Sequence, residues 1–116
     1  MSTADNGVRL RDRCRASTYL TRAEAARVTA LPEIVSIVLH ALTCELAAGH
    51  DGSHVAFTAA VHGGERWWWL RWSDDLRNLV EAEACDRTNI SAPERDDCLL
   101  PKGHPGPHSF DIAAFC

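Results

Sequence analysis

The spacing of apolar and polar positions predicts helices in the first third of the chain. Thr21-Arg-Ala-Glu24 is a capping box, in which the Thr hydroxyl accepts from the N–H three residues on and the Glu carboxylate bonds back. It predicts an Ala-rich helix that ends near Ala30. Pro32 suits the first turn of a second helix, because its missing N–H costs nothing there. One face of this second helix would form the floor of the core, with His40 on its polar, exposed side. The residues of that face are Ile34, Val35, Val38, Leu39 and Leu42.

A β-hairpin is predicted in the middle of the chain. Val55–Val61 is rich in β-branched and aromatic residues, Gly63-Gly64 is a turn signal, and Arg66–Trp72 supplies a second strand. Residues 76–85 fit either a helix or a third strand with alternating apolar and charged positions. We favour the strand, because a hairpin of two strands is only marginally stable alone.

The predicted fold class is α+β, with N-terminal helices packed on a small antiparallel β-sheet. We assign residues 17–116 to a single domain and residues 1–16 to a flexible N-terminal tail. Residues 86–97 are predicted to be a polar loop, and residues 110–116 a short apolar tail. The chain of 116 residues is long enough to bury one modest core.

Charge and composition narrow the class of partner. The net charge of −4 argues against a general affinity for nucleic acid or anionic membranes, which both require a positive protein surface. Alternating arginines before residue 16 could form a nucleic-acid arm, but in an acidic chain a solvated edge is the simpler interpretation. No apolar segment is long enough to span a membrane, and the polar N-terminus lacks a signal peptide. With five cysteines and no export signal, we expect reduced thiols in the cytoplasm.

A pattern of Cys, Gly and His occurs twice. The first copy runs from Cys44 to His54 and the second from Cys98 to His108, and both fit C-x4-G-H-x-G-x-H. The offset between the two copies is the same at every shared position. Their six candidate ligands are Cys44, His50, His54, Cys98, His104 and His108. Because Cys and His are the ligands of structural zinc, the repeat predicts duplicated zinc-knuckle loops and one or two Zn²⁺ per chain.

The residues between the histidines predict a tight turn and exclude a helix. Pro105 and Pro107 flank Gly106, and proline inside a helix costs about 3 kcal/mol or more. Pro105-Gly106 suits a type II turn, and Asp51-Gly52 meets the same need in the first copy. Such a turn lets both imidazoles face the metal. A glycine directly before the first His of each copy indicates positive φ or a close backbone approach.

The repeat leaves the fourth ligand of each triad open. For the second triad, Cys85 is the best candidate, because it follows a predicted strand and the polar loop after it leads the chain back to Cys98. For the first triad, the candidates are Cys116, Cys14 and His62. His62 and Cys116 each lie eight residues beyond their own copy, roughly 26 Å of extended strand, so neither reaches its own triad without a sharp bend. We favour Cys116, which would cross to the first triad and tie down the C-terminus.

A catalytic zinc is the main alternative. Three protein ligands and a water would activate a hydroxide or polarise a carbonyl. Such a site needs a general base, and neither H-E-x-x-H nor the deaminase pattern H-x-E with P-C-x-x-C occurs. The carboxylates in or beside the copies are Glu45, Asp51 and Asp111, and no catalytic motif identifies one of them as the general base. We therefore favour structural zinc over a small zinc enzyme with an open Cys-His-His position.

Four tryptophans crowd the second predicted strand. Trp67, Trp69 and Arg71 lie on one face, and Trp68 and Trp72 lie on the other. Because a half-buried strand exposes one face, at least one ring is either exposed or covered by something else. All four rings could belong to the core. Alternatively, these five residues hold a protein or small-molecule partner, since Trp and Arg anchor interfaces.

The C-x4-G-H-x-G-x-H pattern resembles a motif that recurs in small uncharacterised proteins of actinobacteria and their phages. The likeness covers the two copies, about a fifth of the chain, above all the stretch from Cys98 to His108. It implies zinc binding by the Cys and two His of each copy, and it implies no activity. The leading hypothesis is therefore a cytoplasmic, zinc-stabilised module for partner binding or regulation.

Overall fold

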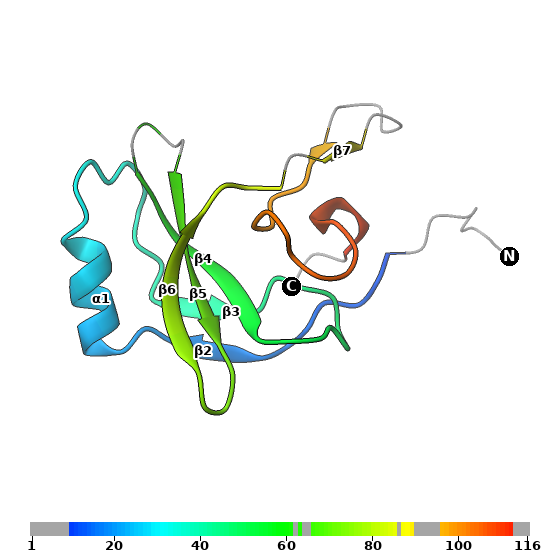
Figure 1. The fold of residues 1–116 in the computed structure, drawn as a ribbon, viewed down its shortest axis with the longest axis horizontal. Coiled ribbons are helices and arrows are strands. Elements are labelled where there is room, and N and C mark those ends of the chain that lie inside the picture. Colours follow the sequence, from blue (N-terminus) through cyan, green and yellow to red (C-terminus); the bar gives the residue numbers. More distant parts are fainter. Residues whose placement is uncertain (1–9, 62, 64–65, 86, 90–95, 113–116) are drawn as a thin grey trace, which may run out of the picture.

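The described part of the chain contains one α-helix and three small antiparallel sheets (Figure 1). The computed structural model describes residues 10–61, 63, 66–85, 87–89 and 96–112. The central sheet has the strand order β4-β5-β6, and the other two sheets are the ribbons β2-β3 and β7-β8. The elements are β2 (Ser17–Tyr19), α1 (Arg22–Thr29), β3 (Ala41–Thr43), β4 (His54–Val61), β5 (Arg66–Trp72), β6 (Arg77–Ala82), β7 (Thr88–Asn89), β8 (Asp96–Asp97) and the 3-10 helix η2 (Ser109–Asp111). A mixed α+β class is confirmed. No helix within these residues has the length and apolar character needed to cross a membrane.

The capping box predicted at Thr21 is present and begins α1. The Glu24 N–H donates to the Thr21 hydroxyl at 3.1 Å, and the Thr21 N–H donates to the Glu24 carboxylate at 2.9 Å. The same carboxylate accepts two bonds from the Arg77 guanidinium on β6, at 2.7 and 2.9 Å. Glu24 therefore starts the helix and also ties it to the central sheet.

The second predicted helix is wrong: residues 33–40 run beside β4 without helical structure. The Leu39 N–H, for example, donates to the Thr58 carbonyl of β4 at 2.9 Å. The segment is rich in β-branched residues, which pack well beside a strand, so pairing with β4 overrides the helical spacing. Of the five residues expected in the floor of the core, only Leu42 is buried. His40 is exposed, as predicted.

The predicted hairpin and third strand together form the central sheet. β4 and β5 pair antiparallel, with a bulge between Phe57 and Ala59. β6 adds to β5 in the register that sets Val80 opposite Trp69, so the strand and not the helix forms here. Gly63 of the predicted turn has a φ of +69°, and the other residues between β4 and β5 lie outside the described residues.

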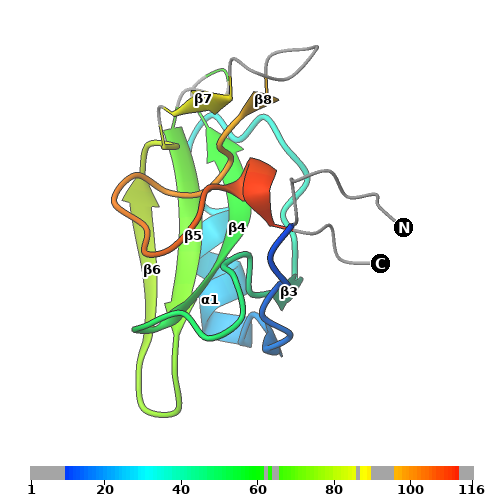
Figure 2. The ribbon, with the colours of Figure 1, turned by 90° about the vertical axis from the view of Figure 1, so that its right-hand side faces the viewer.

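Other parts of the chain cover both faces of the central sheet. α1 lies over one face of the sheet (Figure 1). Val28 of this helix and Trp68 of β5 line a small hollow between the helix and the sheet. The loop of residues 98–105 lies over the other face, on the side away from α1 (Figure 2). Trp69 and Leu70, which point to opposite faces of β5, are both fully buried. The core thus lies between the helix, the sheet and the Cys/His loops.

Residues 10–16, which we assigned to a flexible tail, instead pair with the rest of the domain. Arg11 forms a parallel bridge with Ile112, and Arg13 forms an antiparallel bridge with Ala47. These pairings satisfy backbone groups that a free tail would leave to water. Residues 1–9, the rest of the predicted tail, lie outside the described residues.

Candidate metal centres

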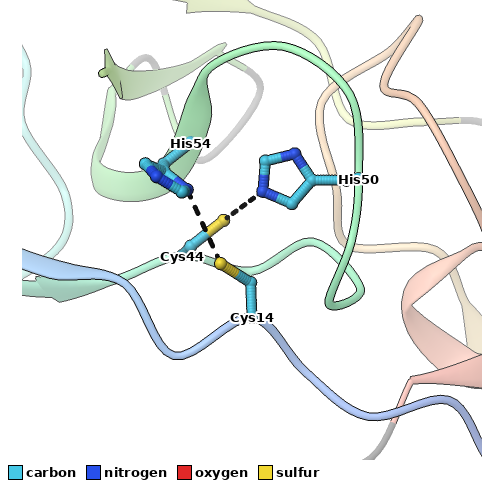
Figure 3. Close-up of side chains that lie close together, drawn as sticks. All are labelled: Cys14, Cys44, His50 and His54. Atoms are coloured by element: carbon cyan, nitrogen blue, oxygen red, sulfur yellow. Dashed lines mark hydrogen bonds between the residues drawn. The ribbon is translucent and has the colours of Figure 1, made fainter. Parts of the chain in front are cut away.

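Two clusters bring the candidate metal ligands together, each with two cysteines and two histidines. The first cluster consists of Cys14, Cys44, His50 and His54, and the second of Cys85, Cys98, His104 and His108. Within each cluster, the four ligand atoms all lie within 4.8 Å of one another. Figure 3 shows the side chains of the first cluster converging from separate segments of the chain. Thiols and imidazoles suit zinc, whereas Mg²⁺ and Ca²⁺ prefer oxygen ligands.

The sulfur–nitrogen distances match those of a tetrahedral metal shell. Cys14 Sγ is 3.5 Å from His54 Nδ1, and Cys44 Sγ is 3.5 Å from His50 Nε2. The second cluster repeats both distances between its own thiols and rings. A tetrahedral zinc with Zn–S bonds of about 2.3 Å and Zn–N bonds of about 2.0–2.1 Å would separate S from N by about 3.5–3.6 Å. The two distances in each cluster are therefore those expected around one tetrahedral metal ion.

Backbone carbonyls determine which nitrogen of the first histidine faces the centre. His50 Nδ1 is 3.1 Å from the Asp51 carbonyl oxygen, and His104 Nδ1 is 3.1 Å from the Pro105 carbonyl oxygen. A carbonyl oxygen can only accept, so each Nδ1 carries the hydrogen and the neutral ring keeps its Nε2 lone pair for the centre. Metal-binding histidines are characteristically oriented by such a bond from their other ring nitrogen.

Aromatic packing holds the second histidine of each cluster. The His54 ring lies 5.3 Å from that of Trp72, and the His108 ring lies 5.3 Å from that of Phe110, between ring centroids. Within each cluster the two imidazoles meet edge to face, with centroids 5.2 Å apart and interplanar angles of 85° and 84°. The clusters are thus copies of one another in side-chain geometry, although they pack against different aromatic neighbours.

The loops that carry the histidines have the turns predicted from the sequence. Gly49 and Gly103, directly before the first His of each copy, have φ values of +81° and +84°. Other residues adopt this left-handed backbone only with strain, which explains glycine at both positions. The turn glycines Gly52 and Gly106 also have positive φ, at +81° and +80°.

The duplication extends upstream of the Cys/His pattern. The Cys14 N–H donates to the Leu46 carbonyl at 2.9 Å, and the Cys85 N–H donates to the Leu100 carbonyl at 2.6 Å. Leu46 and Leu100 occupy equivalent positions of the two copies, so Cys14 and Cys85 do as well. We call residues 12–54 the first module and residues 83–108 the second module.

Each module also contains a ribbon between its two cysteines. In the first module β2 pairs with β3, and in the second module β7 pairs with β8. The ribbon begins three residues after the first cysteine and ends directly before the second in both modules. The predicted polar loop over residues 86–97 therefore includes this short ribbon, while residues 86 and 90–95 lie outside the described residues.

Comparison of the chain with protein-family models, with curated proteins and with solved structures found no match.

Burial changes the acid–base behaviour of the first cluster. It raises the pKa of the Cys44 thiol to about 11, although backbone N–H bonds favour the thiolate. Burial also lowers the pKa of His54, an effect that His50 adds to and Asp74 opposes. Both groups are therefore neutral at pH 7, and a metal ion that binds Cys44 must displace its proton.

The structure brings together seven of the eight predicted ligands and adds Cys14. Cys14, weighed above as an alternative, occupies the fourth position of the first cluster. Cys116, which we favoured, and His62 lie outside the described residues. The sequence does carry a signal for Cys14: like Cys85, it follows an acidic residue by two positions and precedes a Ser or Thr by three.

Two of the four predicted partner-binding tryptophans lie inside the protein. Trp69 is fully buried, with its indole N–H donating to a β6 carbonyl at 3.0 Å, and Trp72 is 6% exposed. Neither ring offers a surface to a partner in this structure, because other segments cover both faces of β5. Trp67 and Trp68 are half-buried and Arg71 is exposed, so a role in partner binding stays a prediction for them.

Proposed function

We propose that the protein is a zinc-stabilised module for partner binding or regulation, with one structural Zn²⁺ in each cluster. The observation that carries this proposal is the repetition of one Cys2His2 geometry. Two separate sets of side chains have the same sulfur–nitrogen distances and nearly the same angle between their rings. A chance meeting of hydrogen-bonding histidines would not reproduce this arrangement twice.

Four ligands in each cluster favour structural ions over a catalytic one. A catalytic zinc keeps one position open for water or substrate. Here each of the four residues offers one ligand atom, and four such atoms complete a tetrahedron. No carboxylate among the described residues belongs to either cluster, so the general base expected beside a catalytic zinc has no candidate there.

A structural role for zinc also fits the segments that the clusters join. The first ion would bind the segment of Cys14 to the loop that leads into β4. The second ion would bind the chain leaving β6 to the loop that lies over the central sheet. Each ion would thus cross-link segments that are distant in sequence, which is how structural zinc stabilises small domains.

Two further features support a binding role in the cytoplasm. An open groove of about 310 Å³ beside Trp67 is lined mainly by apolar side chains, including Phe57 and Leu99, and such a groove suits apolar groups of a partner. The net charge of −4 disfavours nucleic acid as that partner. Zinc ligation requires reduced thiols, which the cytoplasm provides.

On the motif alone, we also propose kinship with the small actinobacterial and phage proteins named above.

Metal content tests this proposal directly. Native mass spectrometry and elemental analysis of the purified chain should find two Zn²⁺ per chain. Replacement by Co²⁺ should give the strong visible absorption of tetrahedral cobalt together with thiolate-to-metal charge-transfer bands. Protein that takes up no zinc, or a cobalt spectrum typical of octahedral oxygen ligands, would contradict the proposal.

A further inference from the structure

A pocket of about 120 Å³ lies between the central sheet and the two modules. Its floor is apolar and includes Leu46, Val55 and Trp69, which are all buried. One wall is the loop Pro101–Pro105 of the second module, and β5 contributes Arg71 to the opening. The pocket is thus formed jointly by three parts of the chain, which is a common setting for ligand sites.

The opening of this pocket is positively charged in a chain that is acidic overall. Arg71 and Lys102 both line it and are both exposed. None of the described residues that line the pocket is acidic. Within the described part of the chain, neither cationic side chain has a hydrogen-bond or ion-pair partner. The charge that complements this opening is therefore negative.

The second metal cluster does not cancel the positive charge of the pocket opening. His104 lines the pocket, but its Nε2 faces Cys98 and its Nδ1 bonds to the Pro105 carbonyl. Two thiolates balance the charge of one Zn²⁺, so the loaded cluster is neutral. A ligand in the pocket would therefore meet two cations and the His104 ring, but no free ring nitrogen.

We infer that this pocket binds a small carboxylate whose body is apolar. Arg71 can hold a carboxylate through two parallel N–H bonds, and Lys102 adds a second charge. The Ser53 hydroxyl, which also lines the pocket, can donate a further bond. The volume leaves room for an apolar group of about three to four heavy atoms, since a dry cavity of about 150 Å³ accepts benzene. Isobutyrate has this combination of charge and size.

The inference rests on the proposed function, because zinc must hold the Pro101–Pro105 wall in position. The test therefore uses the full chain loaded with zinc, and the zinc content of each sample is measured beside ligand binding. Protein that retains two zinc ions but does not bind the carboxylate argues against the pocket inference alone. Protein that takes up no zinc argues against the proposed metal centres.

Binding is measured by titrating isobutyrate, with the indole N–H resonances of the protein followed by NMR. Saturable binding should shift the resonance of Trp69, because its ring forms the floor of the pocket. Isobutyramide, which has the same shape and no charge, should bind at least about tenfold more weakly. A dipeptide that ends in valine, with a free or an amidated C-terminus, shows whether a chain end can supply the same carboxylate.

Charge-removing variants complete the test. Arg71→Gln and Lys102→Gln should each weaken isobutyrate binding by about tenfold and retain two zinc ions. Arg22→Gln, which removes an exposed charge from α1, should bind as the parent protein does. The inference is overturned if isobutyrate does not bind to zinc-loaded protein, if the amide binds equally well, or if both pocket variants bind as the parent does.

Discussion

In each cluster, three of the candidate ligands come from one short loop, and the fourth comes from a segment that precedes this loop in the sequence. In the first module that fourth ligand is Cys14. The two copies keep one constant offset from their second cysteine onwards, but Cys14 and Cys85 are further apart than that offset. A search at constant offset therefore finds Cys44 and Cys98 and misses Cys14. The hydrogen bonds from both cysteines to Leu46 and Leu100, and the ribbon that follows each cysteine, make the two positions equivalent although the connections differ in length.

Replacing single cysteines tests the composition of the first cluster. Cys14→Ser should weaken zinc binding at that cluster by more than about 100-fold, since a serine hydroxyl is a poor substitute for a thiolate ligand. Cys116→Ser serves as the control and should retain both ions. Zinc remaining after competition with a chromophoric chelator measures the difference. The opposite result, with one ion lost only from the Cys116 variant, would restore the assignment favoured from sequence.

At the scale of elements, the sequence predicted the structures whose signals are local. The capping box at Thr21 and the hairpin around Gly63 each depend on residues close in the chain. Residues 33–40 were mispredicted because apolar residues there fit helical spacing as well as pairing with a strand. The contact that decides between them is with β4, which lies beyond the whole first Cys/His loop, and no local pattern encodes it.

The link between α1 and the central sheet is testable through Glu24. Hydrogen bonds from Arg77 are the main reason that the pKa of Glu24 lies below its usual value. The folded protein therefore binds this proton less readily than the unfolded chain, so the pair stabilises the fold above about pH 4.5 and loses its effect as the pH falls below that value. Glu24→Gln should lower the free energy of unfolding by about 1 kcal/mol at pH 7, as measured by urea denaturation.

This loss should shrink as the pH falls from 4.5 through the lowered pKa of Glu24, because protonated Glu24 resembles glutamine. Glu81→Gln is a matched control, because its pair with Arg66 has side chains that are 32% and 59% exposed, against 13% and 31% for Glu24 and Arg77. The control should change stability less, since water screens exposed ion pairs. Equal effects of the two variants at pH 7 would mean that Glu24 is not an anchor.

At the scale of the whole molecule, the two modules and the central sheet share one core. Cys44 and Cys98 are both buried in it, together with Trp69. One cysteine of each cluster therefore lies inside the packed structure, and the ligands cannot separate without exposing core residues. Structural zinc contributes about 10–16 kcal/mol in small zinc domains, which is comparable to the whole stability of a typical domain.

Removal of zinc should consequently unfold the domain. Treatment with a chelator at pH 7 should abolish the near-ultraviolet circular dichroism of the buried tryptophans and the cooperative thermal transition. Adding back Zn²⁺ under reducing conditions should restore both signals. An unchanged spectrum and melting temperature, in protein verified to be free of metal, would show that the fold does not depend on the ions.

The unequal ribbons of the two modules have a practical consequence. The connection from Cys14 to Cys44 includes all of α1 and is much longer than the one from Cys85 to Cys98, yet both clusters keep the same geometry. The stretch between the paired cysteines is thus a natural place for grafting. An engineer could insert a reporter peptide or a small guest domain between residues 89 and 96 and use the two modules as the scaffold that displays it.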